Sequence, residues 1–138
     1  MKDLPTLIEQ AAARITPHIL QTPLLESAYL GAMNHGSVHL KLESEQHTGS
    51  FKARGALNKV LSLSAEEKAA GLVTASSGNH AQGFARALSI SGDHGLIYLP
   101  ENAQPAKVEA LKQYGIELAF HGRDCLQTEL HARAQARE

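Results

Sequence analysis

A lysine stands at the start of an expected helix, where local electrostatics disfavour a cation. The stretch Ser50-Phe51-Lys52-Ala53-Arg54-Gly55-Ala56 precedes apolar residues at helical spacing, so we expect Ser50 to cap a helix whose first turn contains Lys52 and Arg54. The positive end of the helix dipole disfavours a cation there by up to about 1 kcal/mol. A positive environment also lowers the pKa of an amine, and such a lysine suits Schiff-base chemistry. An ordinary solvated lysine on a surface helix is the alternative.

A second stretch offers groups that bind anions. Ser76-Ser77-Gly78-Asn79-His80 follows a short β-like run, Leu72-Val73-Thr74, and continues into a helical pattern. We therefore expect a strand–turn–helix element. Hydroxyls and backbone N–H groups at a helix start suit the binding of an anion. An ordinary capped turn, common in α/β proteins, is the alternative.

Together, Ser-Phe-Lys-x-Arg-Gly-Ala and the later Ser-Ser-Gly-Asn-His-Ala-Gln-Gly closely resemble the motifs of fold-type II pyridoxal-phosphate (PLP) enzymes. The most similar branch is that of the threonine/serine ammonia-lyases (threonine dehydratases), with serine racemase and hydroxyaspartate ammonia-lyase beside it. The resemblance covers nearly all of the 138 residues, which correspond to less than half of a typical family member. It implies the N-terminal part of such an enzyme. Residues 1–47 would belong to the large domain, and residues 48–138 would form the small α/β domain that carries the PLP lysine.

The resemblance also assigns roles to particular residues. Lys52 would hold pyridoxal 5'-phosphate covalently and, once freed, would remove the substrate α-proton, with the cofactor as electron sink. Phe51 would flank the cofactor ring, and Asn79 would hydrogen-bond its 3′-oxygen. The substrate-binding residues would be Ser76, Ser77, Gly78, Asn79 and His80. Donors there would bind the substrate carboxylate, a role that the helix start suits independently. In racemases of the family, a serine matching Ser77 is the opposite-face acid/base, so Ser77 is also a catalytic candidate.

The activity that the resemblance implies is PLP-dependent dehydration and deamination of threonine or serine to a 2-oxo acid and ammonia. The glycine-rich loop that binds the cofactor phosphate lies further along in relatives, and no Gly-Gly-Gly run is present here. We therefore expect these residues alone to be inactive. Three alternatives stay open: a truncated, non-catalytic relative that binds a partner or ligand, a structural α/β domain with idle motifs, and an activity like serine racemase or hydroxyaspartate ammonia-lyase.

The elements that must position both motifs alternate between strands and helices. We expect strands at 38–42, 72–75, 95–99 and 116–120, and helices at 4–15, 27–30, 64–70, 79–91, 104–114 and 124–137 besides the one that begins at Ser50. This order predicts an α/β fold, a mostly parallel open sheet with helices on both faces and right-handed crossovers. Ligands bind such sheets at the carboxyl ends of the strands, where both motifs would lie. Gly83 lies inside an expected helix, where glycine is unfavourable. Either another backbone or the cofactor approaches closely there, or the helix packs closely on the sheet.

Composition indicates a soluble protein of the cytoplasm. Hydrophobic residues make up 43% and the net charge is −1, so neither a nucleic-acid surface nor a membrane patch is indicated. The single cysteine, Cys125, excludes an internal disulfide and suits a reducing compartment. His35 and His39 are four apart, but Gly36 between them argues against a helical metal pair, so we expect no metal site. The family resemblance adds a small amino-acid substrate and a homo-oligomeric full-length form.

Overall fold

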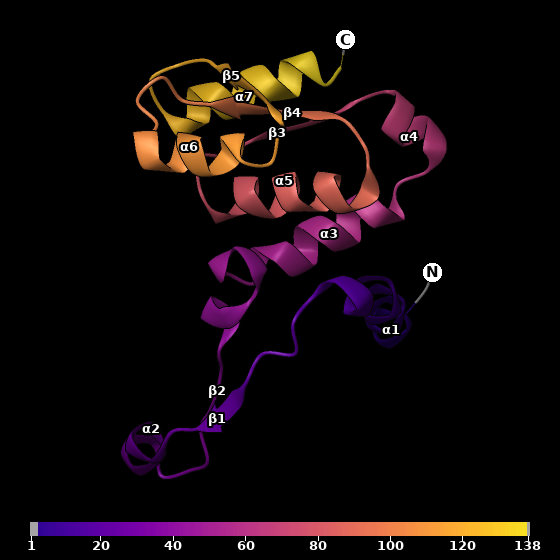
Figure 1. Cartoon of the computed structure of the whole chain (residues 1–138). Coiled ribbons are helices and arrows are strands. Elements are labelled where there is room, and N and C mark those ends of the chain that lie inside the picture. Colours follow the sequence, from indigo (N-terminus) through magenta and orange to yellow (C-terminus); the bar gives the residue numbers. More distant parts are fainter. Residues whose placement is uncertain (1–2, 138) are drawn as a thin grey trace.

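A computed structural model describes residues 3–137 of the chain. A parallel sheet with its helices forms the larger part, and a two-stranded sheet with α2 extends from it (Figure 1). The helices are α1 (Leu4–Ile15), α2 (Ala28–Asn34), α3 (Lys52–Ser62), α4 (Ala65–Ala69), α5 (Asn79–Ser91), α6 (Pro105–Lys112) and α7 (Cys125–Gln135). The strands are β1 (Leu24–Glu26), β2 (His39–Lys41), β3 (Leu72–Ala75), β4 (Gly95–Leu99) and β5 (Glu117–Phe120). Short 3₁₀ helices cover Thr16–His18, Glu43–Glu45 and His47–Gly49.

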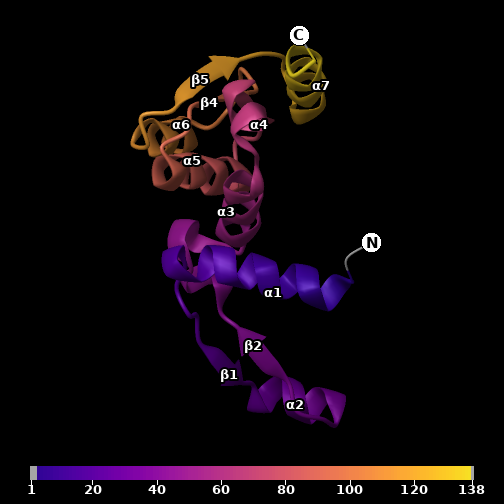
Figure 2. The same cartoon turned by 90° about the vertical axis from the view of Figure 1, so that its right-hand side faces the viewer.

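The parallel sheet has the strand order β3-β4-β5. Leu72 lies opposite Gly95, and Leu96 lies opposite Glu117. Helices α5 and α6, which connect these strands, cover one face, and α7 covers the other (Figure 2). The central strand is an apolar run, as expected for a parallel strand covered on both faces, and Ile97 and Leu99 are fully buried. The predicted fold class, a mostly parallel sheet with helices on both faces, is confirmed.

The first expected strand lies outside this sheet. Residues 38–42 were expected to join the βα alternation, but β2 pairs antiparallel with β1, with Leu25 opposite Leu40. The prediction that this segment is part of the parallel sheet is therefore wrong. The cause is local: only α2 separates the two short strands, so they pair with each other. The helix that follows, α3, packs mainly on α5.

Helix ends follow the expected capping chemistry at several places. Asp3 caps α1, Ser64 and Glu67 form a capping box at α4, and Asp124 caps α7. The helix expected at 27–30 ends later than predicted, because α2 continues to Asn34. Gly31 donates its N–H within the helix, and it is His35 that takes the left-handed conformation at the C-terminus, with a φ of 51°.

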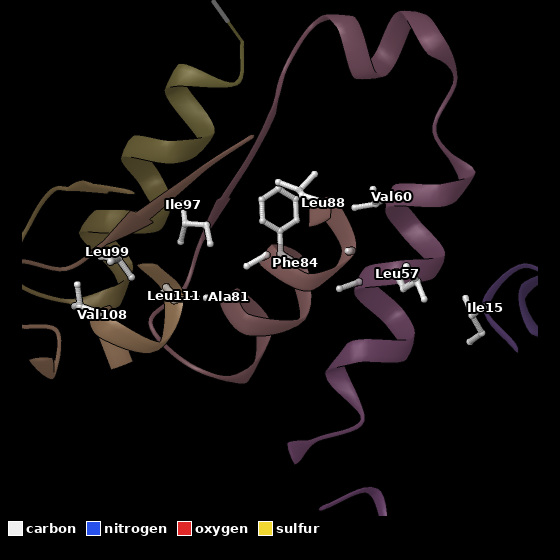
Figure 3. Close-up of a cluster of buried hydrophobic side chains, with 13 residues drawn as sticks. Ile15, Leu57, Val60, Ala81, Phe84, Leu88, Ile97, Leu99, Val108 and Leu111 are labelled. Carbon is white, nitrogen blue, oxygen red and sulfur yellow. The ribbon is translucent and has the colours of Figure 1, made fainter. Parts of the chain in front are cut away.

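The hydrophobic core lies between the sheet, α5 and α3. Phe84 and Leu88 of α5 face Leu57 and Val60 of α3, and Ile15 at the end of α1 lies beyond α3 (Figure 3). Burying an aliphatic or aromatic side chain of this size contributes about 2 kcal/mol. The apolar stripe of α3, read from the sequence as the buried side of a helix, thus holds α3 against α5 and fixes where its first turn lies.

Candidate active site

Lys52 is the first residue of α3, and its side chain is half-buried. Its Nζ lies 4.1 Å from the centroid of the Phe51 ring, so the ammonium group is over an aromatic face. With Ser50 as its cap, α3 would begin at Phe51. It begins one residue later, at Lys52. Phe51 occupies the N-cap position without a side-chain hydrogen bond, and the Ser50 hydroxyl has no hydrogen-bond partner among residues 3–137, so the predicted capping role of Ser50 is wrong.

The loop from Ser76 to Gly78 leaves the carboxyl end of β3 and leads into α5, as the sequence predicted. The Ser76 N–H donates to the Tyr98 carbonyl of β4 at 3.2 Å, and the Ser76 Oγ accepts from the Gly78 N–H at 3.2 Å. Gly78 is the N-cap of α5, and no side chain caps this helix. The first N–H groups of a helix have no partner within it, so the start of α5 is available to an anion.

Asn79 and His80 are the first two residues of α5, and both are exposed. The His80 Nε2 lies 3.1 Å from the Thr74 Oγ1, which links the helix start to β3. Partial burial lowers the pKa of His80, and the nearby charge of Lys52 lowers that pKa further. The charge of Lys52 therefore acts directly on the second stretch.

The two stretches meet because α3 crosses α5, not because both follow strands of one sheet. A Cβ atom placed on Gly83 of α5 would lie 3.0 Å from the Lys52 carbonyl oxygen. The sequence placed both stretches at the carboxyl ends of strands. That holds for Ser76–His80 and is wrong for Lys52, since the strand before it belongs to the other sheet.

One hollow beside the loop does not include the lysine. A cavity of about 230 Å³ is lined by Ser76, Ser77 and Gly78 on one side and by α7 on the other, through Cys125, Thr128 and Glu129. Lys52 and Phe51 are not among its lining residues. Ser77 therefore lines a space on the α7 side of the loop. Among the described residues, Lys52 does not reach that cavity.

Sequence reasoning missed the ion pair that holds the loop before Lys52. Arg54 donates to both carboxylate oxygens of Glu43, from Nε at 2.8 Å and from a terminal nitrogen at 2.7 Å. Hydrogen bonds from Arg54 are the largest cause that lowers the pKa of Glu43 to about 2. The sequence feature that could have indicated this ion pair is Arg54 itself. It is the second cation in a first helical turn, where the helix dipole disfavours cations. Its partner, Glu43, lies in the preceding loop.

The same loop is strained and holds hydroxyls without partners. Thr48 has a φ of 66°, which a β-branched residue rarely adopts. The Oγ atoms of Thr48 and Ser50 are buried, and neither has a hydrogen-bond partner among residues 3–137. Strain and unpaired buried polar groups together concentrate at sites that serve a function.

Neither a metal cluster nor a membrane span is found in the described part of the chain. Within residues 3–137, no group of three or more His, Cys, Asp or Glu side chains is placed to hold a metal ion. Among the helices of that range, none has both the length and the apolar character that crossing a bilayer requires.

Comparison with known proteins gives one consistent family. A family model described as pyridoxal-phosphate dependent enzyme matches residues 15–138. The L-threonine dehydratase catabolic TdcB of Staphylococcus aureus (strain N315) is 46% identical over 132 residues, which are 95% of this chain and 38% of that protein. The threonine deaminase of T.th. superposes with a TM-score of 0.79 at 40% identity, covering 99% of this chain and 42% of that one. Maize serine racemase superposes with a TM-score of 0.82 at 36% identity, covering 92% of this chain and 39% of that one.

The chain spans less than half the length of these relatives. Within that span the family match is nearly continuous, because it begins at Ile15 and includes Lys52 and the whole Ser76–His80 stretch. The family is known for its use of pyridoxal phosphate, as its description states. On these grounds the chain belongs to the family of pyridoxal-phosphate dependent enzymes.

Proposed function

We propose that this chain carries the lysine side of the active site of a PLP-dependent ammonia-lyase that converts threonine or serine to a 2-oxo acid and ammonia. The observation that carries the proposal is the placement of Lys52 at the first turn of α3. Its charge acts on His80 at the uncapped start of α5, and its backbone lies against Gly83 one turn further along α5. An amine near a helix start that suits a carboxylate supports the proposal, because deamination of an amino acid requires both.

The residues present fit one side of a pyridoxal phosphate site. Lys52 would bind the cofactor aldehyde, and the exposed ring of Phe51 beside its Nζ would cover one face of the cofactor. Asn79 would donate to the cofactor from the first position of α5. The phosphate needs a nest of N–H groups such as a glycine run, and this sequence has no Gly-Gly-Gly.

The chain's own groups would act on the substrate as follows. The N–H groups at the start of α5, with Ser76, Ser77, Gly78 and His80, would bind the substrate carboxylate. The free Lys52 amine would accept the α-proton, and the β-hydroxyl would leave as water with a proton returned by the Lys52 ammonium. Pyridoxal phosphate, when bound, supplies the sink for the electron pair left at the α-carbon. The released enamine becomes an imine, and water cleaves its C=N bond to give the 2-oxo acid and ammonia.

The proposal has three further parts. We propose that residues 1–47 belong to a large domain and residues 48–138 form the small domain. In support, the two-stranded sheet within 1–47 shares no strand with the parallel sheet. We also propose that the full-length protein acts in the cytoplasm on a small amino acid and is a homo-oligomer, without a nucleic-acid partner.

Two observations favour other candidate functions. By the family resemblance, Ser77 matches the serine acid/base of the racemases. Serine racemase from maize has a similar structure, and the two together favour racemisation as a side activity. Hydroxyaspartate would be an alternative lyase substrate for the same residues. A non-catalytic relative that binds a ligand or partner is a further candidate, since the cavity beside Ser76–Gly78 does not include Lys52.

The test measures where and how well pyridoxal phosphate attaches. We expect absorbance typical of lysine-bound cofactor, and after borohydride reduction we expect the adduct at Lys52 by peptide mapping. Several charge-assisted contacts of about 1.5–3 kcal/mol each would be missing for the phosphate and ring nitrogen, so binding should be in the millimolar range. Ammonia release from threonine or serine should not exceed that of the Lys52→Ala variant.

Lys59→Ala is the matched control, because Lys59 lies on the same helix and is exposed. It should leave the labelling of Lys52 unchanged. An adduct spread evenly over the lysines, or found chiefly at another lysine, would overturn the assignment. Steady ammonia release by the 138-residue chain that is lost in the Lys52→Ala variant would instead show that the chain contains more of the active site than we propose.

A further inference from the structure

Gly83 lies inside α5 where the backbone of α3 comes closest. A Cβ atom placed on it would lie 3.0 Å from the Lys52 carbonyl oxygen, 3.1 Å from the Lys52 carbonyl carbon and 3.3 Å from the Ala53 nitrogen. All three are backbone atoms of the first turn of α3, so no flexible side chain can move aside. The sequence left two explanations open for Gly83, and a close approach of backbone is the one that applies. The approaching backbone belongs to α3 and not to the sheet.

Gly55 provides the contrast. It lies inside α3, three residues after Lys52, and a Cβ atom placed on it meets nothing within 4 Å. Gly55 and Gly83 each cost about 1 kcal/mol relative to alanine through backbone entropy. Of these two, only Gly83 lies where a Cβ atom would press on the backbone of another helix.

We propose that Gly83 is a positioning residue that sets where Lys52 stands relative to the start of α5, an inference that rests on the proposed function of Lys52. The rest of α3 cannot move in response to a side chain at position 83. Leu57 and Val60 hold the middle of α3 in the core, with 3% and 2% exposure. The displacement therefore falls on the first turn, whose residues have the fewest backbone bonds within the helix.

The loop side of this turn is also held. Arg54 is bound to Glu43 by two hydrogen bonds, so the turn cannot simply swing away from α5 as a unit. The residues that must absorb the displacement are Phe51 and Lys52, which are the two proposed to meet the cofactor. The close contacts call for a shift of roughly a few tenths of an ångström. A shift of about 1 Å in a reacting group reduces rates by about 100-fold, so this smaller shift should have a severalfold effect.

The experiment compares Gly83→Ala with Gly55→Ala, because both gain helix propensity and only the first meets the α3 backbone. Each variant is treated with pyridoxal phosphate and borohydride, at a temperature where circular dichroism shows it folded. Mass spectrometry then gives the ratio of adduct at Lys52 to adduct at Lys59. We expect this ratio to fall severalfold in Gly83→Ala, because the amine is displaced, and to stay unchanged in Gly55→Ala.

A measurement on the unaltered protein does not depend on either variant folding. A nuclear Overhauser contact between the Gly83 Hα protons and the Ala53 amide proton should be present, and its absence would overturn the proposal. An unchanged adduct ratio in folded Gly83→Ala would also overturn it.

A different result would refute the proposed function instead: no preference of the adduct for Lys52 in the unaltered protein. Amide shifts of Lys52 and Ala53 in Gly83→Ala would still test the positioning, and shifts no larger than those in Gly55→Ala would refute it.

Discussion

Replacing Glu43 by glutamine tests how the loop before the lysine is held. Hydrogen bonds from Arg54 are the largest cause that lowers the Glu43 pKa from 4.5 to about 2, and a hydrogen bond from Thr22 adds to them against the opposing effect of burial. Each pKa unit corresponds to about 1.4 kcal/mol, so the full shift corresponds to about 3 kcal/mol at neutral pH. The Arg54 and Glu43 side chains keep 30% and 18% of their exposure, so solvent screening reduces this. We expect Glu43→Gln to lower the free energy of unfolding by about 2 kcal/mol at pH 7.

The pH dependence follows from the direction of the shift. The folded-state pKa of Glu43 lies below its value in the unfolded chain, so its contribution is fully present above the unfolded value of 4.5. As the pH falls from 4.5 toward about 2, the unfolded state takes up a proton first and the contribution is lost. The difference between the original protein and Glu43→Gln should therefore be largest at pH 7 and should shrink steadily below pH 4.5.

Urea denaturation followed by circular dichroism at pH 7, 5, 4 and 3 measures this difference. The control is Glu109→Gln, which breaks an ion pair with Lys112 whose side chains are 66% and 58% exposed. Such an exposed pair should contribute less than about 1 kcal/mol, so the control variant should lie close to the original protein throughout. A difference for Glu43→Gln that is the same at pH 7 and pH 3, or no larger than that of the control, would refute the reasoning.

Three further changes test the packing and the local backbone by urea denaturation. Thr48→Gly should raise the free energy of unfolding by about 1 kcal/mol, because it relieves the strain of a β-branched residue at a φ of 66°; a decrease would contradict this. Leu99→Ala should lower it by about 3 kcal/mol, since Leu99 is fully buried in the central strand, and a loss below about 1 kcal/mol would contradict the core assignment. Ser64→Ala should lower it by about 1 kcal/mol through loss of the capping box at α4, whereas exposed Ser62→Ala should change little; equal effects would contradict the capping argument.

Much of the α/β part was predictable because its signals are local. The helix from Asn79 to Ser91 has its apolar residues at helical spacing and ends at Gly92, which takes a positive φ of 73°. The strand from Gly95 to Leu99 is an apolar run bounded by Gly92 and Pro100. Strands that alternate with such helices favour parallel pairing, and the structure pairs them so.

What could not be predicted depends on contacts between distant residues. Periodicity does not reveal that β2 would pair with β1, because strands of three residues carry too little pattern to select a partner. It also does not reveal the Glu43–Arg54 pair, or that the backbone of Lys52 would lie against Gly83. The roles of Lys52, Ser77 and Asn79 stay predictions, since they come from the family resemblance.

The capping pattern distinguishes the two motif helices from most other helices of the described residues. Within residues 3–137, side chains cap α1, α2, α4 and α7 at Asp3, Ser27, Ser64 and Asp124. Helices α3, α5 and α6 have no side-chain cap, and α6 begins with a proline, which has no N–H to satisfy at its first position. The two remaining uncapped starts are those of the Lys52 and Asn79 helices, which lie against each other.

An aspartate or serine at either start would have added about 1 kcal/mol, as the caps elsewhere in the chain do. Instead, the charge of Lys52 adds to two positive helix ends. Burial is the larger cause that lowers the pKa of His80, and the Lys52 charge lowers that pKa further. This local excess of positive charge is unfavourable for stability, and a bound anion would offset it. The electrostatics at the two helix starts thus support a carboxylate-binding role that the family resemblance proposes on separate grounds.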